Sequence, residues 1–172
     1  MVNGLVSKTS VLRDIQVRIL SPAFMKIYRP VVMAVVFRKT RTRTMFLLLH
    51  KIKNWRGYEF PKGGIRDGET DWVAIERELK EEVGLPIVEL KKTPMTVEYK
   101  WPKGYKADYP EYNGVKSHLF VAEVKGERVS LDKSEHDNYI WVEADKALKR
   151  LTWKDQQNAL KYVLEHYFFM PQ

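Results

Sequence analysis

Three glutamates in one stretch of the chain are spaced for a shared chemical task. Glu78, Glu81 and Glu82 stand at positions i, i+3 and i+4, and residues at these spacings share one face of an α-helix. Carboxylates gathered on one face repel one another unless a positive charge lies among them, and a divalent metal ion is the most plausible source. A glycine-rich turn leads into the same helix. The stretch therefore predicts a metal site in an enzyme that handles phosphates.

The alternative interpretation is an acidic helix face in contact with water, which is common in proteins. For three glutamates alone that interpretation would be preferred. The metal-site interpretation is favoured instead, because Lys62-Gly63-Gly64, Glu69 and Gly84 stand in register with the glutamates. Carboxylate oxygens are hard ligands that suit Mg²⁺ or Mn²⁺, and Mg²⁺ commonly binds substrate phosphates as well. We therefore expect Mg²⁺, or Mn²⁺, as the cofactor.

The helix that carries the glutamates has its own start and stop signals. Thr70 is a good N-cap, because its hydroxyl can accept a hydrogen bond from a backbone N–H at the helix start. Gly84 follows the last turn, where a left-handed residue ends a helix at little cost. Arg77 stands beside Glu78 but on another face, from which it could brace a carboxylate or contact a phosphate oxygen. An apolar stripe that should pack on a sheet consists of Trp72, Ile75, Leu79 and Val83.

Residues 63–85, GGIRDGETDWVAIERELKEEVGL, resemble the Nudix box at every specified position. The resemblance implies a hydrolase of nucleoside diphosphates linked to another group, in which water attacks phosphorus beside a metal ion. It assigns Glu78, Glu81 and Glu82 to the metal shell. A backbone carbonyl at Lys62 or Gly63 would add a further ligand.

The resemblance also bears on catalysis. We place Glu78, Arg77 and Glu82 among the catalytic residues. A general base must lie within hydrogen-bond reach of the attacking water. Glu78 is the first choice for this base, although its helix position does not separate it from Glu82.

A second segment, residues 134–142 (SEHDNYIWV), resembles the E-x-x-x-Y/W-x-W stretch of two Nudix subfamilies. These are the asymmetric diadenosine tetraphosphate (Ap4A) hydrolases and the bacterial RNA pyrophosphohydrolases. The FPKGG run at residues 60–64 is similar to both. The resemblance gives Glu135 the role of a metal ligand from outside the box. The alternative for Glu135 is an exposed loop acid.

Candidates for substrate binding lie on both sides of the box. Lys62, next to the glycine turn, is predicted to contact phosphates. His118 either replaces a phosphate-contacting lysine of these subfamilies or is a strand residue facing solvent.

We expect one aromatic side chain to stack on the base, with Tyr99, Trp101 and Tyr112 as candidates, because stacking tolerates any base. Tyr99 and Trp101 alternate on a strand and could equally form one face of the core. The whole aromatic group is Tyr99, Trp101, Tyr105, Tyr109 and Tyr112.

The elements that must position these residues can be inferred from apolar periodicity. Two β-branched apolar runs, 31–37 and 44–50, flank the charged turn 38–43 and predict a hairpin. Thr152 with Asp155 should cap a final helix that has an apolar face. Strands interleaved with helices on both sides of a sheet predict an α/β/α sandwich. The resemblance to the Nudix family implies the Nudix-type sandwich with a mixed central sheet. Three further strands are expected, at 97–101, 116–124 and 139–142.

Composition narrows the class of protein. A chain of 172 residues suits one domain with a sizeable core. The absence of cysteine excludes disulfides, a thiolate zinc site and a cysteine nucleophile, and it fits a reducing cytoplasm. No apolar run approaches the ~20 residues of a membrane span, so no membrane partner is expected. The choice between monomer and dimer stays open.

The net charge of +8 is unevenly spread along the chain. Residues 1–62 contain 13 Lys/Arg against 2 Asp/Glu, whereas residues 63–85 contain 3 against 7. A basic half around an acidic metal centre fits a polyanionic substrate, although such residues also occur as ordinary solvated charges. Residues 1–24 lack a sustained period, and within them residues 16–23 (QVRILSPA) resemble translated upstream non-coding DNA. We therefore expect an N-terminal extension at 1–24, with Met25 as the natural first residue, and a Nudix hydrolase domain at 25–172.

These observations predict a metal-dependent pyrophosphohydrolase that splits Ap4A into ATP and AMP. The alternatives are an RNA 5′-pyrophosphohydrolase, whose long substrate benefits more from a broad basic surface, and a (d)NTP pyrophosphatase. The partner is then a nucleotide, a dinucleoside polyphosphate or an RNA 5′ end. A different class is a nucleotide- or nucleic-acid-binding module that has lost catalysis. The intact Arg77, Glu78, Glu81 and Glu82 argue against that class.

Overall fold

The computed structural model describes residues 28–101 and 109–168. The expectations for residues 1–24, for Met25 and for Tyr105 lie outside these ranges, so the domain boundaries stay a prediction. None of the helices in the described part of the chain combines the length and apolar character needed to cross a membrane.

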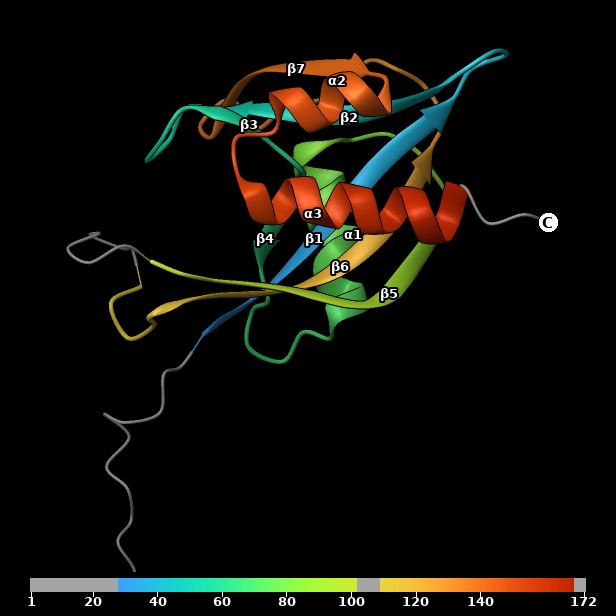
Figure 1. Ribbon diagram of the computed structural model, residues 1–172. Helices are drawn as coiled ribbons and strands as arrows, with labels where there is room; N and C mark the ends of the chain where they lie inside the picture. Colours follow the sequence, from blue (N-terminus) through green and yellow to red (C-terminus); the bar gives the residue numbers. More distant parts are fainter. Residues whose placement is uncertain (1–27, 102–108, 169–172) are drawn as a thin grey trace, which may run out of the picture.

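A seven-stranded mixed sheet forms the centre of the molecule (Figure 1). The strands are β1 (Arg29–Lys39), β2 (Thr44–Lys51), β3 (Gly57–Glu59), β4 (Lys62–Gly64), β5 (Ile87–Lys100), β6 (Gly114–Val124) and β7 (His136–Val142). Their order is β3-β2-β1-β6-β5, with β4 paired to β1 and β7 paired to β2. Strands β1 and β6 run parallel, whereas the other pairs are antiparallel. The predicted mixed sheet is confirmed.

Helices cover both faces of this sheet. They are α1 (Asp71–Glu82), α2 (Ala144–Arg150) and α3 (Lys154–Val163), and a π-helical turn, Leu164–Phe168, follows α3. In Figure 1, α3 crosses in front of the sheet and α1 lies behind it. Successive residues of β1 alternate between the two cores: Val32 and Ala34 pack with α1, whereas Met33 and Val35 pack with α3. The expected α/β/α sandwich is confirmed.

The predicted hairpin is also confirmed. Phe37 of β1 pairs with Phe46 of β2, and a backbone hydrogen bond of 2.8 Å from Thr40 N to the Arg43 carbonyl closes the charged turn. At the start of α1, the Thr70 hydroxyl accepts from Val73 N, as expected of an N-cap. At its end, Gly84 adopts φ +67°, the left-handed conformation that favours glycine.

One strand boundary and one expectation about an apolar face are wrong. The strand expected at 97–101 is present, but it begins ten residues earlier, at Ile87, because β5 keeps its pairing with β6 through an irregularity between Lys92 and Thr96. Most of its side chains are exposed, so a search for apolar runs misses the first half. Trp72 does not join the buried stripe of α1. Its side chain is 45% exposed and meets Phe120 edge-on.

The predicted cap of the last helix is wrong as well. The N-cap of α3 is Trp153, and no side chain caps it. The Thr152 hydroxyl instead accepts a hydrogen bond of 3.0 Å from the backbone N–H of Tyr58. Tertiary contact with β3 therefore takes the hydroxyl that a local rule assigns to the helix end.

Candidate active site

The glutamates of α1 lie against strand β4, because a glycine there leaves room for them. Gly63 pairs with Val32 of β1, and a Cβ atom at this position would collide with the carboxylate of Glu78. One residue earlier, the backbone N–H of Lys62 donates to Glu82 Oε2 at 3.0 Å. The glycine turn therefore brings peptide backbone into direct contact with both buried acids.

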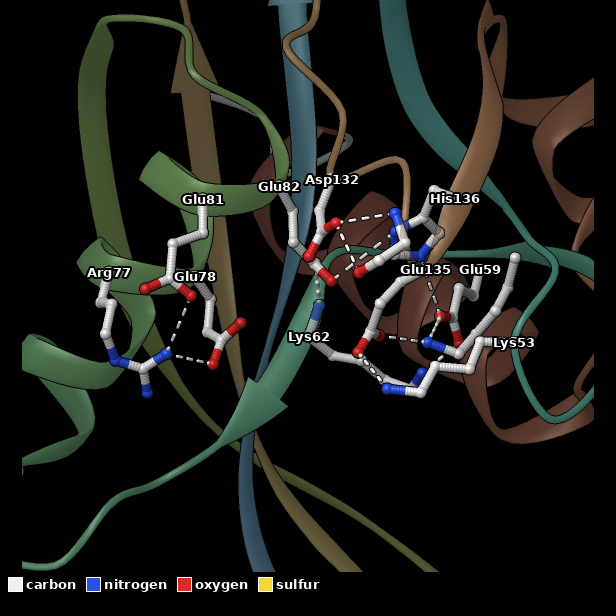
Figure 2. Close-up of polar contacts among 12 residues, drawn as sticks. Lys53, Glu59, Lys62, Arg77, Glu78, Glu81, Glu82, Asp132, Glu135 and His136 are labelled. Atoms are coloured by element: carbon white, nitrogen blue, oxygen red, sulfur yellow. Dashed lines mark hydrogen bonds and ion pairs between the residues drawn. The ribbon is translucent and has the colours of Figure 1, made fainter.

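A cavity of about 390 Å³ opens over these two glutamates. Figure 2 shows Arg77, Glu78 and Glu81 on one side, Glu59, Glu135 and His136 on the other, and Lys62 with Glu82 between them. Three kinds of side chain dominate the lining, namely acids, bases and aromatic rings. The acids are Glu78, Glu81, Glu82, Asp132 and Glu135; the bases are Arg29, Lys51, Lys53, Lys62 and Arg66; the aromatic residues are Trp55, Tyr99, Trp101 and Tyr109.

Two of the α1 glutamates, Glu78 and Glu82, are buried, and their pKa values are raised. Burial, together with the neighbouring carboxylates of Glu59 and Glu78, raises the pKa of Glu82 to about 8 against the opposing effect of Lys62. Burial also raises the pKa of Glu78, although Arg77 partly opposes this change. Two carboxylates with raised pKa values in one cavity indicate a place where added positive charge would be stabilising.

Arg77 fastens the loop before α1 to the helix. Its guanidinium donates to both carboxylate oxygens of Glu69, at 2.7 and 2.8 Å, to Glu78 at 2.5 Å, and to the Gly64 carbonyl at 2.9 Å. The bonds from Arg77, together with the backbone N–H of Arg66, lower the pKa of Glu69 to about 2. Arg77 does not itself line the cavity. In this arrangement it positions Glu78 and the glycine turn.

A second buried network lies under the cavity, and it was not predicted from the sequence. Glu59 is 1% exposed. Its carboxylate is paired with Lys62 Nζ, lies 3.6 Å from Lys51 Nζ and lies 3.3 Å from His136 Nε2. Burial alone would raise the pKa of Glu59, but Lys62, His136 and Lys51 outweigh it and lower the pKa to about 2. One signal was available: an acid on a short strand directly before the buried Phe60.

Glu135 reaches the cavity from the loop before β7. Its carboxylate pairs with Lys51 at 2.7 Å and with Lys53 at 3.2 Å. Burial would raise the pKa of Glu135, but these two lysines outweigh it and lower the pKa. Asp132, which the sequence did not single out, lines the same wall and accepts from the Ser134 hydroxyl at 2.7 Å.

The structure brings most of the sequence candidates together and leaves three apart. Lys62, Gly63, Tyr99 and Trp101 line the cavity with the glutamates, whereas Arg77, His118 and Tyr112 do not. His118 lies on β6, and its Nδ1 is 2.5 Å from Asp71 Oδ2 at the start of α1. Tyr112 belongs to the turn before β6, where its backbone N–H donates to the Tyr109 carbonyl.

The donor set suits a hard divalent cation. Glu78 and Glu82 are buried and the pKa of each is raised, and carboxylate and carbonyl oxygens are the ligands that Mg²⁺ and Mn²⁺ prefer. Within residues 28–101 and 109–168, no three acidic or histidine side chains already form a ready cation site. Instead Arg77 holds Glu78 and Glu81, and two lysines hold Glu135. A metal ion bound by Glu78, Glu81 or Glu135 would therefore displace the arginine or lysine side chain that now pairs with that carboxylate.

Comparison with known proteins assigns the family. The NUDIX domain model matches residues 27–163, so the chain belongs to the Nudix family. It is 30% identical over 148 residues to an RNA pyrophosphohydrolase of a Sulfurovum species, covering 83% of this chain and 94% of that protein. An RNA pyrophosphohydrolase of a Nitratiruptor species is 33% identical over 113 residues, or 64% of this chain and 73% of that protein. An Ap4A hydrolase of C. elegans, solved as a binary complex, has a TM-score of 0.63 and 26% identity, covering 77% of this chain and 93% of that one.

Membership of this family sets the class of reaction. The chain is a Nudix hydrolase that acts on phosphorus-containing anhydrides, with nucleotide-linked substrates. Hydrolases of this family generally use divalent metals such as Mg²⁺, in agreement with the excess of negative charge on α1. Substrate choice within this class is a separate question.

Proposed function

We propose that the chain removes pyrophosphate from the triphosphorylated 5′ end of RNA, with Mg²⁺ or Mn²⁺ as cofactor. The observation that carries this proposal is the cavity lining, in which five Lys and Arg side chains occur together with the buried Glu78 and Glu82. A group of cations beside a metal-dependent hydrolytic centre suits a substrate whose charge continues beyond the reacting phosphates. The two RNA pyrophosphohydrolases that the chain resembles support the same choice.

A bound divalent ion would neutralise phosphate oxygens and lower the pKa of a coordinated water. Glu78, Glu82 and Glu135, with the Gly63 carbonyl, are the groups that would hold it. In the proposed reaction Glu78 accepts a proton from the attacking water, and the water oxygen forms a bond to phosphorus. The anhydride P–O bond breaks, and pyrophosphate leaves with the bonding electron pair. Lys62 and Lys53 lie on the cavity wall and balance the charge of the departing pyrophosphate.

Asymmetric hydrolysis of Ap4A to ATP and AMP is the second candidate. The specific observation in its favour is that aromatic side chains stand on two walls of the cavity, Trp55 on the β2–β3 loop and Tyr99, Trp101 and Tyr109 near the ends of β5 and β6. Two walls could each stack on one of two adenines. The likeness to the C. elegans Ap4A hydrolase favours it too. This was the first prediction from the sequence, and it stays a prediction.

A side-by-side assay separates the candidates. Triphosphorylated RNA oligonucleotide, Ap4A and ATP are each offered at equal concentration with Mg²⁺, and the products are resolved chromatographically. We expect pyrophosphate and monophosphorylated RNA to form fastest, with a rate that falls more steeply with salt than the rate on Ap4A. Faster release of ATP and AMP from Ap4A would favour the second candidate. No turnover of any of the three would indicate a binding module instead.

EDTA and Glu82→Gln serve as controls in this assay. Both should abolish turnover of every substrate, because each removes charge from the same centre. Activity that survives both would trace to a contaminating phosphatase.

A further inference from the structure

Trp55 and Trp153 form an aromatic pair at the mouth of the cavity that the hydrolytic mechanism does not use. Trp55 lines the cavity from the loop between β2 and β3. The ring of Trp153, at the start of α3, meets it edge-on, with a centroid separation of 5.3 Å and an interplanar angle of 74°. Trp153 is itself 47% exposed. A tryptophan pair in partial contact with solvent is poorly explained by core packing alone.

Backbone contacts fix this pair in place. Tyr58 N donates to the Thr152 hydroxyl, and Thr152 N donates to the Tyr58 carbonyl at 3.1 Å. These bonds fasten the α2–α3 connection to β3. Gly57 lies in the same contact, since a Cβ atom there would collide with the Trp55 ring and with Thr152. The loop therefore needs glycine at this position in order to seat Trp55 beside Trp153.

The ring of Trp55 lies next to the groups that handle phosphate. Lys62 Nζ is 5.9 Å from its centroid, within the range of a cation–π contact. Lys62 also pairs with Glu59, and its backbone N–H holds Glu82. A nucleotide with its phosphates at Lys62 and the α1 glutamates would thus have an indole face close at hand.

A second aromatic group lines the same cavity. It consists of Tyr99, Trp101 and Tyr109, and the Arg29 guanidinium lies 3.8 Å from the Tyr109 ring centroid. In Figure 1 the β2–β3 tip and the end of β5 both project to the left of the sheet. The base-stacking candidates predicted from the sequence include Tyr99 and Trp101 of this group but not Trp55.

We propose that Trp55, braced by Trp153, is a nucleobase-stacking surface of the active site. Its ligand is the base of a nucleotide whose phosphates lie at Lys62. Aromatic stacking tolerates every base, so this wall supplies affinity without sequence preference. The proposal rests on the proposed function only in taking a nucleotide as the ligand. Trp55 is a binding residue, and Trp153 positions it.

The test compares a nucleotide with the same molecule lacking its base. AMP and ribose 5-phosphate are titrated by calorimetry, with Mg²⁺, against the whole chain. Neither contains an anhydride, so hydrolysis does not disturb the measurement. We expect Trp55→Leu to weaken AMP binding by ~10-fold, the size expected for the loss of one stacked base, and to leave ribose 5-phosphate unchanged. Trp55→Phe should recover part of the loss.

The matched control is Trp72→Leu. Trp72 is also an exposed tryptophan that meets another ring edge-on, 5.1 Å from Phe120, but it does not line the cavity. It should leave both affinities unchanged. An AMP affinity in Trp55→Leu within twofold of the parent would overturn the proposal, and so would an equal loss for both ligands.

Turnover measurements keep the two proposals apart. If neither RNA nor Ap4A is hydrolysed but the advantage of AMP over ribose 5-phosphate depends on Trp55, the proposed function fails and the stacking surface stands. If substrates are hydrolysed and Trp55→Leu leaves KM unchanged, the stacking surface fails and the proposed function stands. With both correct, Trp55→Leu raises KM by ~10-fold and changes kcat little.

Discussion

Glu59 and Glu82 are two buried carboxylates that share a neighbour and yet differ in ionisation. Glu59 is 1% exposed and Glu82 is 7% exposed. Glu59 Oε1 lies 3.3 Å from His136 Nε2, and Glu82 Oε1 lies 3.8 Å from His136 Nδ1. Nevertheless the pKa of Glu59 is lowered to about 2, whereas that of Glu82 is raised to about 8.

The origin of the compensating charge explains the difference. Glu59 has Lys62 and Lys51 within ion-pair distance, so its charge is balanced by the chain itself. Glu82 accepts one backbone hydrogen bond and faces two other carboxylates, so its charge is unbalanced. A buried charge without a partner is costly, and a site that keeps one is suited to a charge from outside. By this comparison we expect Glu59 to hold the site together and Glu82 to receive a cation.

The largest expected effect is on turnover. Glu82→Gln and Glu78→Gln each remove a charge that a divalent ion needs and keep the shape of the side chain. We expect kcat to fall by at least ~100-fold in each variant, in the range of lost acid–base or metal chemistry. The measurement is steady-state hydrolysis with saturating Mg²⁺. Glu76→Gln, an exposed position on the same helix, is the matched control and should keep full activity.

If both variants hydrolyse substrate at the parent rate, the reactive centre lies elsewhere in the cavity. A loss confined to one of them would identify which of the two glutamates the reaction depends on.

The second prediction concerns stability and has opposite signs at the two glutamates. Glu59→Gln leaves Lys62 and Lys51 without their buried partner, and breaking such a pair should cost about 3 kcal/mol. Glu82→Gln removes an unbalanced charge, so at pH 8 in EDTA it should stabilise the fold, by up to about 4 kcal/mol. Urea unfolding measures both. Glu127→Gln, in an exposed pair with Arg38, should change stability by less than about 1 kcal/mol. Destabilisation by both buried variants would show that the two carboxylates do not differ.

The third prediction is the pH range over which each glutamate acts. The pKa of Glu82 rises on folding from 4.5 to about 8, so the folded state keeps a proton that the unfolded state releases. Its contribution to stability is present below pH 4.5 and is lost as pH rises through 8. The pKa of Glu59 falls from 4.5 to about 2, so its contribution is present above pH 4.5 and is lost as pH falls through 2.

Unfolding free energies measured in EDTA across this range test the assignment. Between pH 5 and 8 the parent should lose up to ~1.4 kcal/mol per pH unit relative to Glu82→Gln. Added Mg²⁺ should reduce that difference, because the ion favours the ionised carboxylate. Parallel pH curves for the parent and Glu82→Gln would show that Glu82 ionises normally in the folded state.

Local rules predicted the parts of this site that lie close together in sequence. Thr70 and Gly84 bound α1 as their types require, and the spacing of Glu78 and Glu82 brings both to the cavity. These outcomes depend on helix geometry alone. The mixed sheet followed from alternating patterns and from family resemblance.

The network around Glu59 could not be predicted in the same way. Its partner His136 is 77 residues away in the sequence. Lys51 and Glu135, whose side chains form a hydrogen bond beside it, are 84 residues apart. Such pairs arise only when β7 lies beside β2, and that register is a property of the whole sheet. Trp55 was missed for the same reason, because its place in the cavity depends on contacts with Thr152 and Trp153.

The smallest expected effect concerns Glu78, whose charge is balanced by the chain less fully than that of Glu59 and more fully than that of Glu82. Glu78 is buried, which raises its pKa, but Arg77 opposes the rise, so the chain balances it in part. Arg77→Lys keeps the positive charge and loses the fork that spans Glu69, Glu78 and the Gly64 carbonyl. We expect kcat to fall by about 5–10-fold, equivalent to about 1 kcal/mol. The acidic limb of the pH–rate profile should also move to higher pH, because Glu78 would bind its proton more tightly.

That shift of the acidic limb distinguishes positioning of Glu78 from general destabilisation, which would lower the rate at every pH. Arg43→Lys is the control, since Arg43 also pairs with a glutamate at 2.5 Å but on the exposed β1–β2 turn. It should change neither the rate nor the profile. An unmoved limb in Arg77→Lys would mean that the fork of Arg77 contributes nothing to the pKa of Glu78 beyond the positive charge that lysine also carries.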